Sequence, residues 1–249
     1  MLSWRDLVRL AWRCLFVQMS WNFKGFQNLG RLWVLSPFLR RWHHDRMDLP
    51  FCSRYGSYFN TNVFLLPTVL AATLALEEKD REGQSVPLDG VAFGQAVMAP
   101  VAAVGDALFW GGLRPLIVLG AVVLAWFGYT WSPWLALLLF VLLTTYVRLY
   151  GVFKGYALGP QVVGLIQQFR LAGCAVVLKQ MSLVVLGSFA ALLADALVAE
   201  PAVALSGPLL VGLVAALTLA WGLCCCRRVV ATVLLWWCAV AVAMATAML

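Results

Sequence analysis

Two charged residues stand close together inside a long apolar stretch of the sequence. Asp106 and Arg114 flank the apolar segment 107–113. A charged side chain in the hydrocarbon of a bilayer costs roughly 2.5–3.5 kcal/mol on insertion scales, so such residues usually face a cavity or a partner group. Residue type and spacing therefore make Asp106 and Arg114 the first candidates for a functional site. The alternative is a structural ion pair or a position at the membrane interface.

The cysteines and histidines lack the spacing of a catalytic or metal-binding site. Residues 224–226 are three adjoining cysteines, not a C-x-x-C pair, and no histidine is near them in the sequence. His43 and His44 are adjacent, so on a helix they would point in different directions. A phosphohistidine role is the alternative to a polar juxtamembrane loop. The sequence contains no phosphate loop, H-E-x-x-H or nucleophile elbow, and we expect no catalytic residue, metal or cofactor.

The composition indicates that much of this protein is surrounded by lipid. The 249 residues are 63% hydrophobic and only 12% charged, with a mean hydropathy of +0.88. Soluble domains are nearer half apolar and a quarter charged, and a soluble protein of this size could not keep so much apolar surface from water. The composition therefore excludes an ordinary cytosolic enzyme, a disordered chain and a disulfide-stapled secreted domain.

The elements that carry the two charges are predicted to be transmembrane helices. Between Arg114 and Arg148 lie 33 uncharged residues, which is too many for one crossing of about 20 residues. Turn-forming residues at 128–133 therefore predict a helical hairpin. Residues 201–226 and 229–249 are uncharged stretches that each suit one further span.

Three other apolar segments are interrupted by polar residues or by proline. Irregular backbone at membrane depth is tolerated where it lines a cavity within a bundle. We therefore predict an all-α integral membrane protein, a multi-span helical bundle with discontinuous or re-entrant helices. The interrupted segments are 55–76, 90–105 and 181–194.

The first 54 residues are strongly basic, with nine Lys and Arg against three Asp. Arg5, Arg9 and Arg13 recur every four residues and so form one stripe of a helix. This pattern predicts an N-terminal amphipathic helix at the membrane surface, in the cytosol by the positive-inside rule. We expect a single domain, 1–249, in which the basic segment 1–54 precedes an embedded bundle, 55–249. The apolar stripe of the predicted helix consists of Leu7, Leu10, Ala11, Cys14 and Leu15.

Five motifs resemble, in the same order, those of the IID component of mannose-family phosphotransferase systems. The first, S-W-N-F-K-G-F-Q-N-L-G at 20–30, is similar to the family's S-W-N-F-x-x-x-Q-N-L-G. The longest, P-V-A-A-V-G-D-A-L-F-W-G-G-L-R-P at 100–115, is similar to P-x-x-x-x-G-D-x-x-F-W-G-x-x-R-P. The others are F-N-T at 59–61, L-A-L-E-E at 74–78 and Y-G-V-F-K-G-Y-A-L-G at 150–159.

The resemblance implies a subunit of a group-translocation system in the bacterial inner membrane. Members of this family pair with a homologous IIC membrane subunit to move a hexose inward, and a cytosolic IIB protein, charged by IIA, phosphorylates the arriving sugar. The IID chain carries no phosphohistidine and is a non-catalytic subunit. The implied partners are therefore IIC, IIB and IIA, the hexose and the lipid bilayer, without nucleic acid, and IIC–IID pairs are expected to form a higher oligomer.

The resemblance also marks residues for sugar translocation or for the IIC interface. Amide side chains donate to and accept from hydroxyls, and a carboxylate accepts them. Trp110 offers a ring face for stacking, and Arg114 could neutralise Asp106 or hold IIC. Helix packing is the alternative role for all of these residues, which are Trp21, Asn22, Gln27, Asn28, Asn60, Asp106, Trp110 and Arg114.

Two positions depart from the family pattern. Asn62-Val63 stand where the family has His-Pro, and Lys24-Gly25 stand where an acidic residue and an arginine often follow S-W-N-F. These departures bear on the sugar preference and on transport itself. They leave a second hypothesis open, a non-transporting membrane sensor, docking protein or receptor that retains the IID fold.

Overall fold

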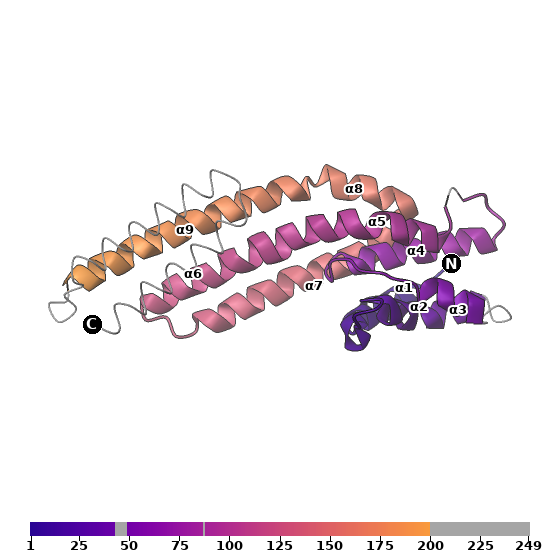
Figure 1. Cartoon of the computed structure of the whole chain (residues 1–249), viewed down its shortest axis with the longest axis horizontal. Coiled ribbons are helices and arrows are strands. Elements are labelled where there is room, and N and C mark those ends of the chain that lie inside the picture. Colours follow the sequence, from indigo (N-terminus) through magenta and orange to yellow (C-terminus); the bar gives the residue numbers. More distant parts are fainter. Residues whose placement is uncertain (43–48, 87, 200–249) are drawn as a thin grey trace. The chain divides into compact units, whose positions relative to one another are not determined.

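The computed structural model describes residues 1–42, 49–86 and 88–199 (Figure 1). The chain forms two compact units, Met1–Leu186 and Gly187–Leu249, and the described part of the second unit is the end of one helix. The prediction of a single domain with a boundary at residue 54 stays a prediction. Outside the described residues lie the predictions for the paired histidines 43–44, the cysteines 224–226 and the spans 201–226 and 229–249.

The described residues form helices that are joined by turns and by two isolated β-bridges. This confirms the predicted all-α fold. In chain order the helices are α1 (Trp4–Cys14), η1 (Val17–Ser20), α2 (Asn28–Trp42), α3 (Leu49–Tyr55), α4 (Leu66–Arg81), α5 (Gly90–Gly105), η3 (Asp106–Leu113), α6 (Arg114–Trp126), α7 (Ser132–Leu158), η4 (Gly159–Gln161), α8 (Val162–Gln168) and α9 (Leu171–Ala199).

Helix α4 is the buried centre of the first unit. Its residues from Leu66 to Glu78 are all buried, because α4 packs against α5, α7 and the N-terminal helices. Pro67 lies in the first turn, where its missing N–H removes no helical hydrogen bond. The predicted interrupted segment 55–76 is therefore an irregular stretch followed by a short, buried helix.

Helix α7 approaches α4 through two glycines spaced as G-x-x-x-G. A Cβ atom added at Gly151 would collide with the hydroxyl of Thr68, and one at Gly155 would collide with the Thr68 carbonyl oxygen. Small residues at this spacing allow two helix backbones to come close together. The tight packing of α4 on α7 therefore depends on these two glycines.

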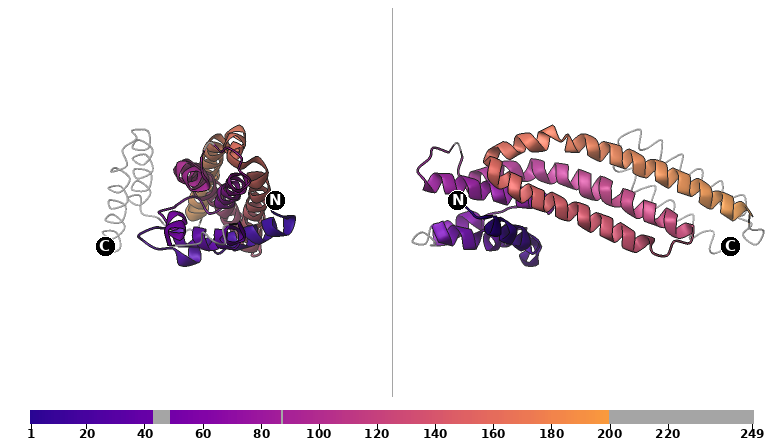
Figure 2. Two further views of the ribbon diagram at one scale, coloured as in Figure 1. Left: turned by 90° about the vertical axis from the view of Figure 1, so that its right-hand side faces the viewer. Right: turned by 180° about the vertical axis from the view of Figure 1, so that it is seen from behind.

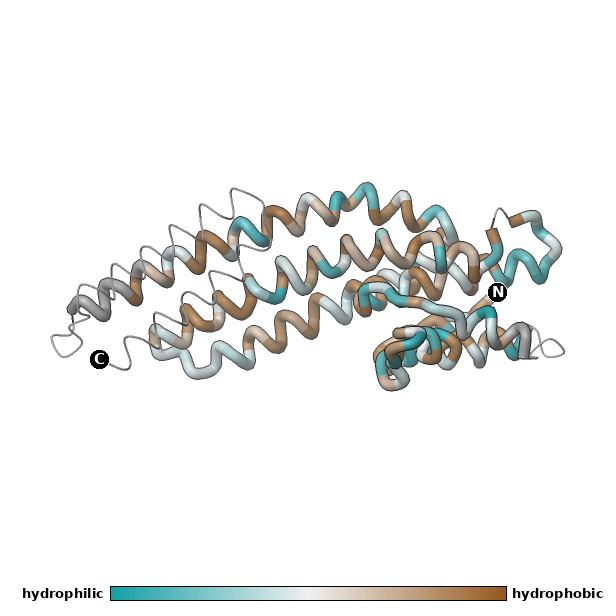
Figure 3. The backbone as a smooth tube through the Cα atoms, viewed as in Figure 1, coloured by the Kyte–Doolittle hydropathy of each residue, from teal (hydrophilic) through white to brown (hydrophobic). Residues whose placement is uncertain are grey.

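Helices α5, η3 and α6 run on as one helix, Gly90–Trp126, which a turn around Gly128 (φ +87°) connects to α7. Since α6 packs against α7, the predicted hairpin is confirmed. Two helical segments, Gly90–Trp126 and Ser132–Ala190, are long and apolar enough to cross a membrane. Figure 3 shows hydrophobic residues along α6 and the adjoining part of α7, and hydrophilic residues at the connection between α4 and α5.

Two of the segments predicted to be half-helices are parts of continuous helices. Residues 90–105 continue into η3, and residues 181–194 lie within α9. A charged side chain such as Asp106 does not end a helix, because the main-chain hydrogen bonds continue past it. The bends come instead at Gly159 (φ +55°) and Arg170 (φ +47°), so the predicted discontinuity is found on either side of α8.

Helix α1 has the predicted amphipathic pattern, but protein covers its apolar face. Ser3 and Asp6 form a capping box at its start. Leu7, Leu10, Ala11 and Cys14 are buried, and α1 packs against α2, α4 and α7. The remaining predicted member of the stripe, Leu15, is 43% exposed, because the helix ends before it. Figure 2 shows α1 to α3 lying crosswise beside the long helices.

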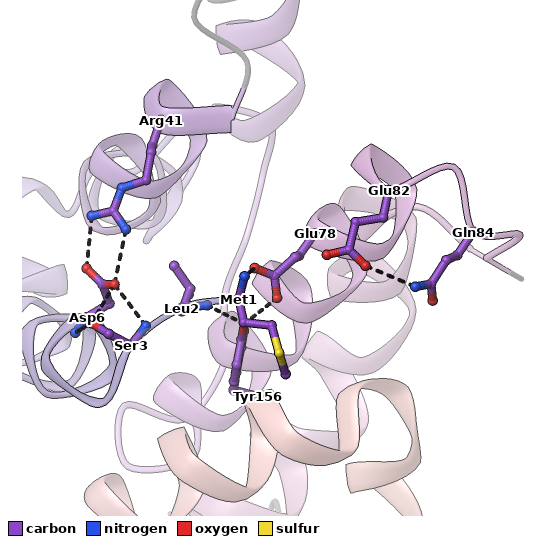
Figure 4. Close-up of polar contacts among 9 residues, drawn as sticks. All are labelled: Met1, Leu2, Ser3, Asp6, Arg41, Glu78, Glu82, Gln84 and Tyr156. Atoms are coloured by element: carbon purple, nitrogen blue, oxygen red, sulfur yellow. Dashed lines mark hydrogen bonds and ion pairs between the residues drawn. The ribbon is translucent and has the colours of Figure 1, made fainter.

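Polar contacts fasten the N-terminal residues and α1 to the neighbouring helices (Figure 4). The amino group of Met1 lies 2.9 Å from Glu78 Oε1, and the Tyr156 hydroxyl donates a hydrogen bond to the same carboxylate. Arg41 binds Asp6 through both guanidinium nitrogens, at 2.9 and 3.0 Å. This bidentate pair holds the pKa of the Asp6 carboxyl well below its usual range. The contacts set the position of α1 against α2, α4 and α7.

Candidate functional site

Asp106 is the first residue of η3, and its side chain is exposed. Asn62 Nδ2 donates a hydrogen bond to Asp106 Oδ1 at 2.8 Å. Asn62 itself is 2% exposed, and its Oδ1 accepts a hydrogen bond from the Phe64 N–H at 2.9 Å. A Cβ atom at Gly105 would collide with the Asn62 side chain. The carboxylate is thus held by one buried, oriented donor, and it has further acceptor capacity for a ligand.

The helix turn that carries Asp106 has π-helical hydrogen bonding. The Arg114 N–H bonds to the Phe109 carbonyl, five residues earlier. Gly111 and Gly112 have low helix propensity and Pro115 lacks a main-chain donor, so the stretch can leave the α-helical register. Single π-helical turns inside longer helices frequently mark functional sites.

Trp110 places an indole ring beside this carboxylate-bearing turn. It is 42% exposed, and its ring centroid lies 5.2 Å from that of Phe64 and 6.3 Å from that of Phe140. The guanidinium carbon of Arg114 lies 5.4 Å from the same indole centroid. Within residues 1–42, 49–86 and 88–199, no ion pair joins Arg114 to Asp106. Arg114 therefore makes a cation–π contact where the sequence suggested neutralisation of Asp106.

Asn62 and Lys179 belong to this site but were not among its predicted residues. A Cβ atom at Gly111 would lie 2.9 Å from Lys179 Cε and 3.3 Å from Lys179 Nζ, so the lysine passes against the π-helical turn. Lys179 is a lone cation within the apolar sequence of α9, which is the signal that singled out Arg114. In the sequence, Asn62 stands out only as a departure from the family pattern. Nothing in the sequence pairs it with Asp106.

Asn22 and Asn28, two of the predicted amides, hold a loop together. Asn22 Oδ1 accepts a hydrogen bond from the Gly25 N–H at 2.8 Å, and its Nδ2 donates to Asn28 Oδ1 at 2.9 Å. Asn28 Nδ2 donates to the Gly56 carbonyl at 2.7 Å. These bonds join the stretch before α2 to the stretch after α3, and they use the donors and acceptors that a sugar hydroxyl would need.

Gln27 also bonds within the fold, whereas Asn60 keeps its amide available. Gln27 Nε2 donates to the Thr61 carbonyl at 2.8 Å, and its Oε1 accepts from the Thr61 N–H at 3.0 Å. The half-buried side chain of Asn60 has no hydrogen-bond partner among the residues that the structure describes. Since Asn60 stands two residues before Asn62, it is the predicted amide that connects the loop to the Asp106 site.

Trp21 belongs to a separate cluster of aromatic rings. Its ring centroid lies 4.9 Å from that of Phe23 and 5.3 Å from that of Phe26, and Phe26 lies 5.4 Å from Tyr58. Trp21, Phe23 and Tyr58 are exposed. The structure therefore divides the predicted residues. Trp21, Asn22, Gln27 and Asn28 lie in the loop that leads into α2 or at its first residue, and Asp106, Trp110 and Arg114 lie on η3 and α6, with Asn60 between the two groups in the chain.

Arg31 is a buried cation that the sequence analysis did not single out. Its guanidinium donates to the carbonyls of Tyr55 and Ser57 near the end of α3, and it lies 4.6 Å from the Phe59 ring centroid. Burial lowers the pKa of Arg31 to about 10. Because helix carbonyls at a C-terminus attract cations, Arg31 fastens α2 to α3 and to the stretch that leads to Asn62.

A protein-family model agrees with the motifs on which the resemblance was based. The model described as the PTS system mannose/fructose/sorbose family IID component matches residues 1–202. The chain belongs to this family. The IID motif that contains Asp106, Trp110 and Arg114 is thus the π-helical turn and its continuation into α6.

Two IID relatives show how far the sequence similarity extends. The mannose-specific EIID component of Escherichia coli K12 is 33% identical over 167 residues, which are 65% of this chain and 58% of that protein. The sorbose-specific EIID component of Klebsiella pneumoniae is 30% identical over 162 residues, 64% of this chain and 58% of its own length. The aligned part therefore spans less than two thirds of either relative.

Solved structures share this IID fold. A cryo-EM structure of the mannose transporter ManYZ with microcin E492 is similar with a TM-score of 0.59 and 30% identity, over 76% of this chain and 70% of that chain. A structure described as a membrane protein is similar with a TM-score of 0.66 and 30% identity, over 75% of this chain and 70% of that chain. The family and the two long apolar segments identify this IID chain as a membrane protein.

Proposed function

We propose that this chain is the IID membrane subunit of a mannose-family sugar transporter. It acts with a IIC subunit to translocate a hexose, which IIB phosphorylates on entry after IIA has charged it. The observation that carries the proposal is the exposed Asp106 carboxylate, held by buried Asn62 beside the Trp110 ring in a membrane helix. The family and the similarity to a mannose transporter structure support it.

The chemistry of the turn suits a polyhydroxylated ligand. A carboxylate accepts hydrogen bonds from two or more hydroxyls, and Asn62 is the one donor that binds Asp106 among the described residues. The amide of Asn60, two residues before Asn62 in the stretch that leads into α4, can both donate and accept hydrogen bonds. The Trp110 indole offers an apolar ring surface, and the cation–π contact with Arg114 helps to orient the ring. Ground-state binding of the sugar then rests on Asp106 and Trp110, with Asn62 as a positioning residue.

The apolar surface of the bundle suits a membrane subunit that works in a complex. The side chains of α6 are not buried within the described part of the chain, so lipid or the IIC subunit covers them. The positive-inside rule supports a cytosolic position for the basic N-terminal segment. In a bacterial inner membrane, IIB and IIA then act on the N-terminal side of the chain. IIC–IID pairs then assemble into a higher oligomer.

The test is phosphoenolpyruvate-dependent sugar phosphorylation by membranes that contain the Asp106→Asn chain. A hydrogen bond to a charged group is worth about 1.5–3 kcal/mol. We therefore expect the rate of sugar phosphorylation, and with it sugar uptake, to fall roughly 10- to 100-fold. Asp80→Asn is the matched control, because Asp80 is exposed at the end of α4 and should leave uptake unchanged. Wild-type uptake by correctly assembled Asp106→Asn membranes would remove Asp106 from the translocation site.

A broader comparison separates transport from the second hypothesis. Membranes with and without this chain are assayed for the same phosphorylation, in the presence of IIC, IIB and IIA. If this chain is the transport subunit, we expect the membranes that lack it to show no sugar phosphorylation. Equal activity in both membranes would instead favour a sensor, docking or receptor protein with the IID fold.

A further inference from the structure

An apolar groove lies between α7 and α8, apart from the Asp106 site. Its volume is about 450 Å³, which lies in the range of small-molecule sites. None of the residues that line it belongs to the sugar-site candidates. Its walls come from α7 and α8, and its floor comes from Leu65 and Thr68 at the start of α4.

Two bends in the backbone create this groove. Helix α7 ends at Leu158, and Gly159, with φ +55°, begins the short η4 turn. Helix α8 then has seven residues and ends before Arg170, whose φ of +47° redirects the chain into α9. Helix α8 lies between these two bends, and the groove lies between it and α7.

The groove is apolar along its length and cationic at one end. Tyr146 stacks on Tyr150 at 5.9 Å, and Tyr150 meets Phe169 edge-on at 6.3 Å. Lys154 lines the groove, with its ammonium 5.9 Å from the Tyr150 ring centroid. In the part of the chain that the structure describes, Lys154 has no acidic partner. A ligand that fits has an apolar chain and an anionic head.

The cationic end of the groove lies toward the basic N-terminal helices. Tyr156, two residues after Lys154, accepts a hydrogen bond from the Leu2 N–H at 2.7 Å and donates to Glu78. From Tyr146 to Lys154 the groove follows α7 for about 12 Å, at 1.5 Å per residue. The end near the N-terminus faces the cytosolic leaflet by the positive-inside rule. Anionic phospholipids are found in that leaflet, and basic pockets between transmembrane helices bind their head groups.

We propose that this groove binds one anionic phospholipid. An acyl chain lies along Tyr146, Tyr150 and Leu165, and the phosphate contacts Lys154. The volume fits a lipid chain, whereas a partner helix would need a broader apolar face. The proposal does not depend on sugar transport.

The experiment is native mass spectrometry of the full chain in detergent, titrated with dioleoyl phosphatidylglycerol or with dioleoyl phosphatidylcholine. Wild type should retain one phosphatidylglycerol in preference to phosphatidylcholine. Lys154→Gln should weaken phosphatidylglycerol retention about fivefold, the effect of roughly one cation near a head group, without changing phosphatidylcholine retention. The matched control is Lys79→Gln, because Lys79 is exposed on α4 outside the groove. Leu165→Trp, which fills the groove, should abolish the preference.

Three outcomes would overturn the proposal. Equal retention by Lys154→Gln and Lys79→Gln would show that the groove lysine does not select the lipid. Equal binding of the two lipids to wild type would show no preference for an anionic head. Loss of the lipid when the IIC subunit is co-purified would show that a protein partner occupies the groove.

Discussion

At the scale of single residues, Asp106 differs from an ion-paired acid because its one hydrogen-bond partner among the described residues, Asn62, is neutral. Asn62 donates a hydrogen bond to it without cancelling its charge, whereas Arg114 stacks on Trp110. A carboxylate at membrane depth is costly unless donors surround it. The arrangement therefore leaves Asp106 in need of further donors, which sugar hydroxyls or the IIC subunit would supply.

We predict that Asn62→Leu impairs transport while the membrane subunit still assembles. Leucine has a similar size but no donor, so Asp106 loses the hydrogen bond that positions it. The expected loss in sugar uptake is about tenfold. Uptake is measured together with the amount of chain in the membrane.

Gln167→Leu serves as the control for that experiment. Gln167 is exposed on α8, and the described structure gives its side chain no hydrogen bond, so its uptake should match wild type. Unchanged uptake in Asn62→Leu would mean that Asp106 works without this donor.

At the scale of the elements, the contact between α4 and α7 sets where Asn62 and Asp106 meet. Asn62 leads directly into α4, and Thr68 in its first turns lies against Gly151 and Gly155 of α7. Aromatic contacts of Phe64 with Trp110 and Phe140 then join the start of α4 to η3 and α7. The position of α4 therefore determines where Asn62 lies relative to Asp106 at the candidate site.

We predict that Gly155→Ala destabilises the protein, because its methyl group would collide with the Thr68 carbonyl. Overpacking of this kind costs about 1–3 kcal/mol, and it should lower the midpoint of thermal unfolding in detergent. Gly164→Ala on α8 is the matched control, since its Cβ would meet nothing within 4 Å. The control should be neutral or slightly stabilising, because alanine is the better helix former. Equal midpoints for the two variants would contradict the close α4–α7 contact.

At the scale of the whole molecule, the two ends of the Gly90–Trp126 helix are far enough apart to lie on opposite sides of a membrane. Its 37 residues span about 55 Å at 1.5 Å per residue, compared with about 30 Å for the hydrocarbon core. Ser85 precedes this helix, and Thr130 follows it in the turn to α7. Both side chains are exposed.

We predict that Thr130→Cys reacts with a membrane-impermeant maleimide in intact cells and that Ser85→Cys reacts only after lysis. The reason is that Ser85 lies toward the basic N-terminal helices, which the positive-inside rule places in the cytosol. Labelling of the unsubstituted chain measures the background from its own cysteines. The reverse pattern would contradict the orientation, and labelling of both sites in intact cells would contradict the crossing.

The local features of this fold could be predicted from the sequence, and the contacts between distant segments could not. The amphipathic pattern of α1 and the turn at Gly128 depend on neighbouring residues, so they are visible as periodicity and turn composition. The Asn62–Asp106 hydrogen bond joins residues 44 positions apart, and no periodicity records it. The half-helix prediction for 90–105 was wrong because main-chain hydrogen bonds continue past Asp106, so a charge in the sequence does not mark a break in the backbone.

The sequence by itself determined that lipid surrounds this protein, that its elements are helices, and that it is a IID chain. Those properties follow from composition, from periodicity and from ordered motifs, which are local or additive along the chain. Only the tertiary structure decided that Asp106 meets Asn62, that Arg114 meets Trp110, and that Asn22 and Asn28 bond within a loop. Such pairings depend on the packing of helices that are remote in sequence, because a hydrogen bond forms only when packing brings donor and acceptor to about 3 Å.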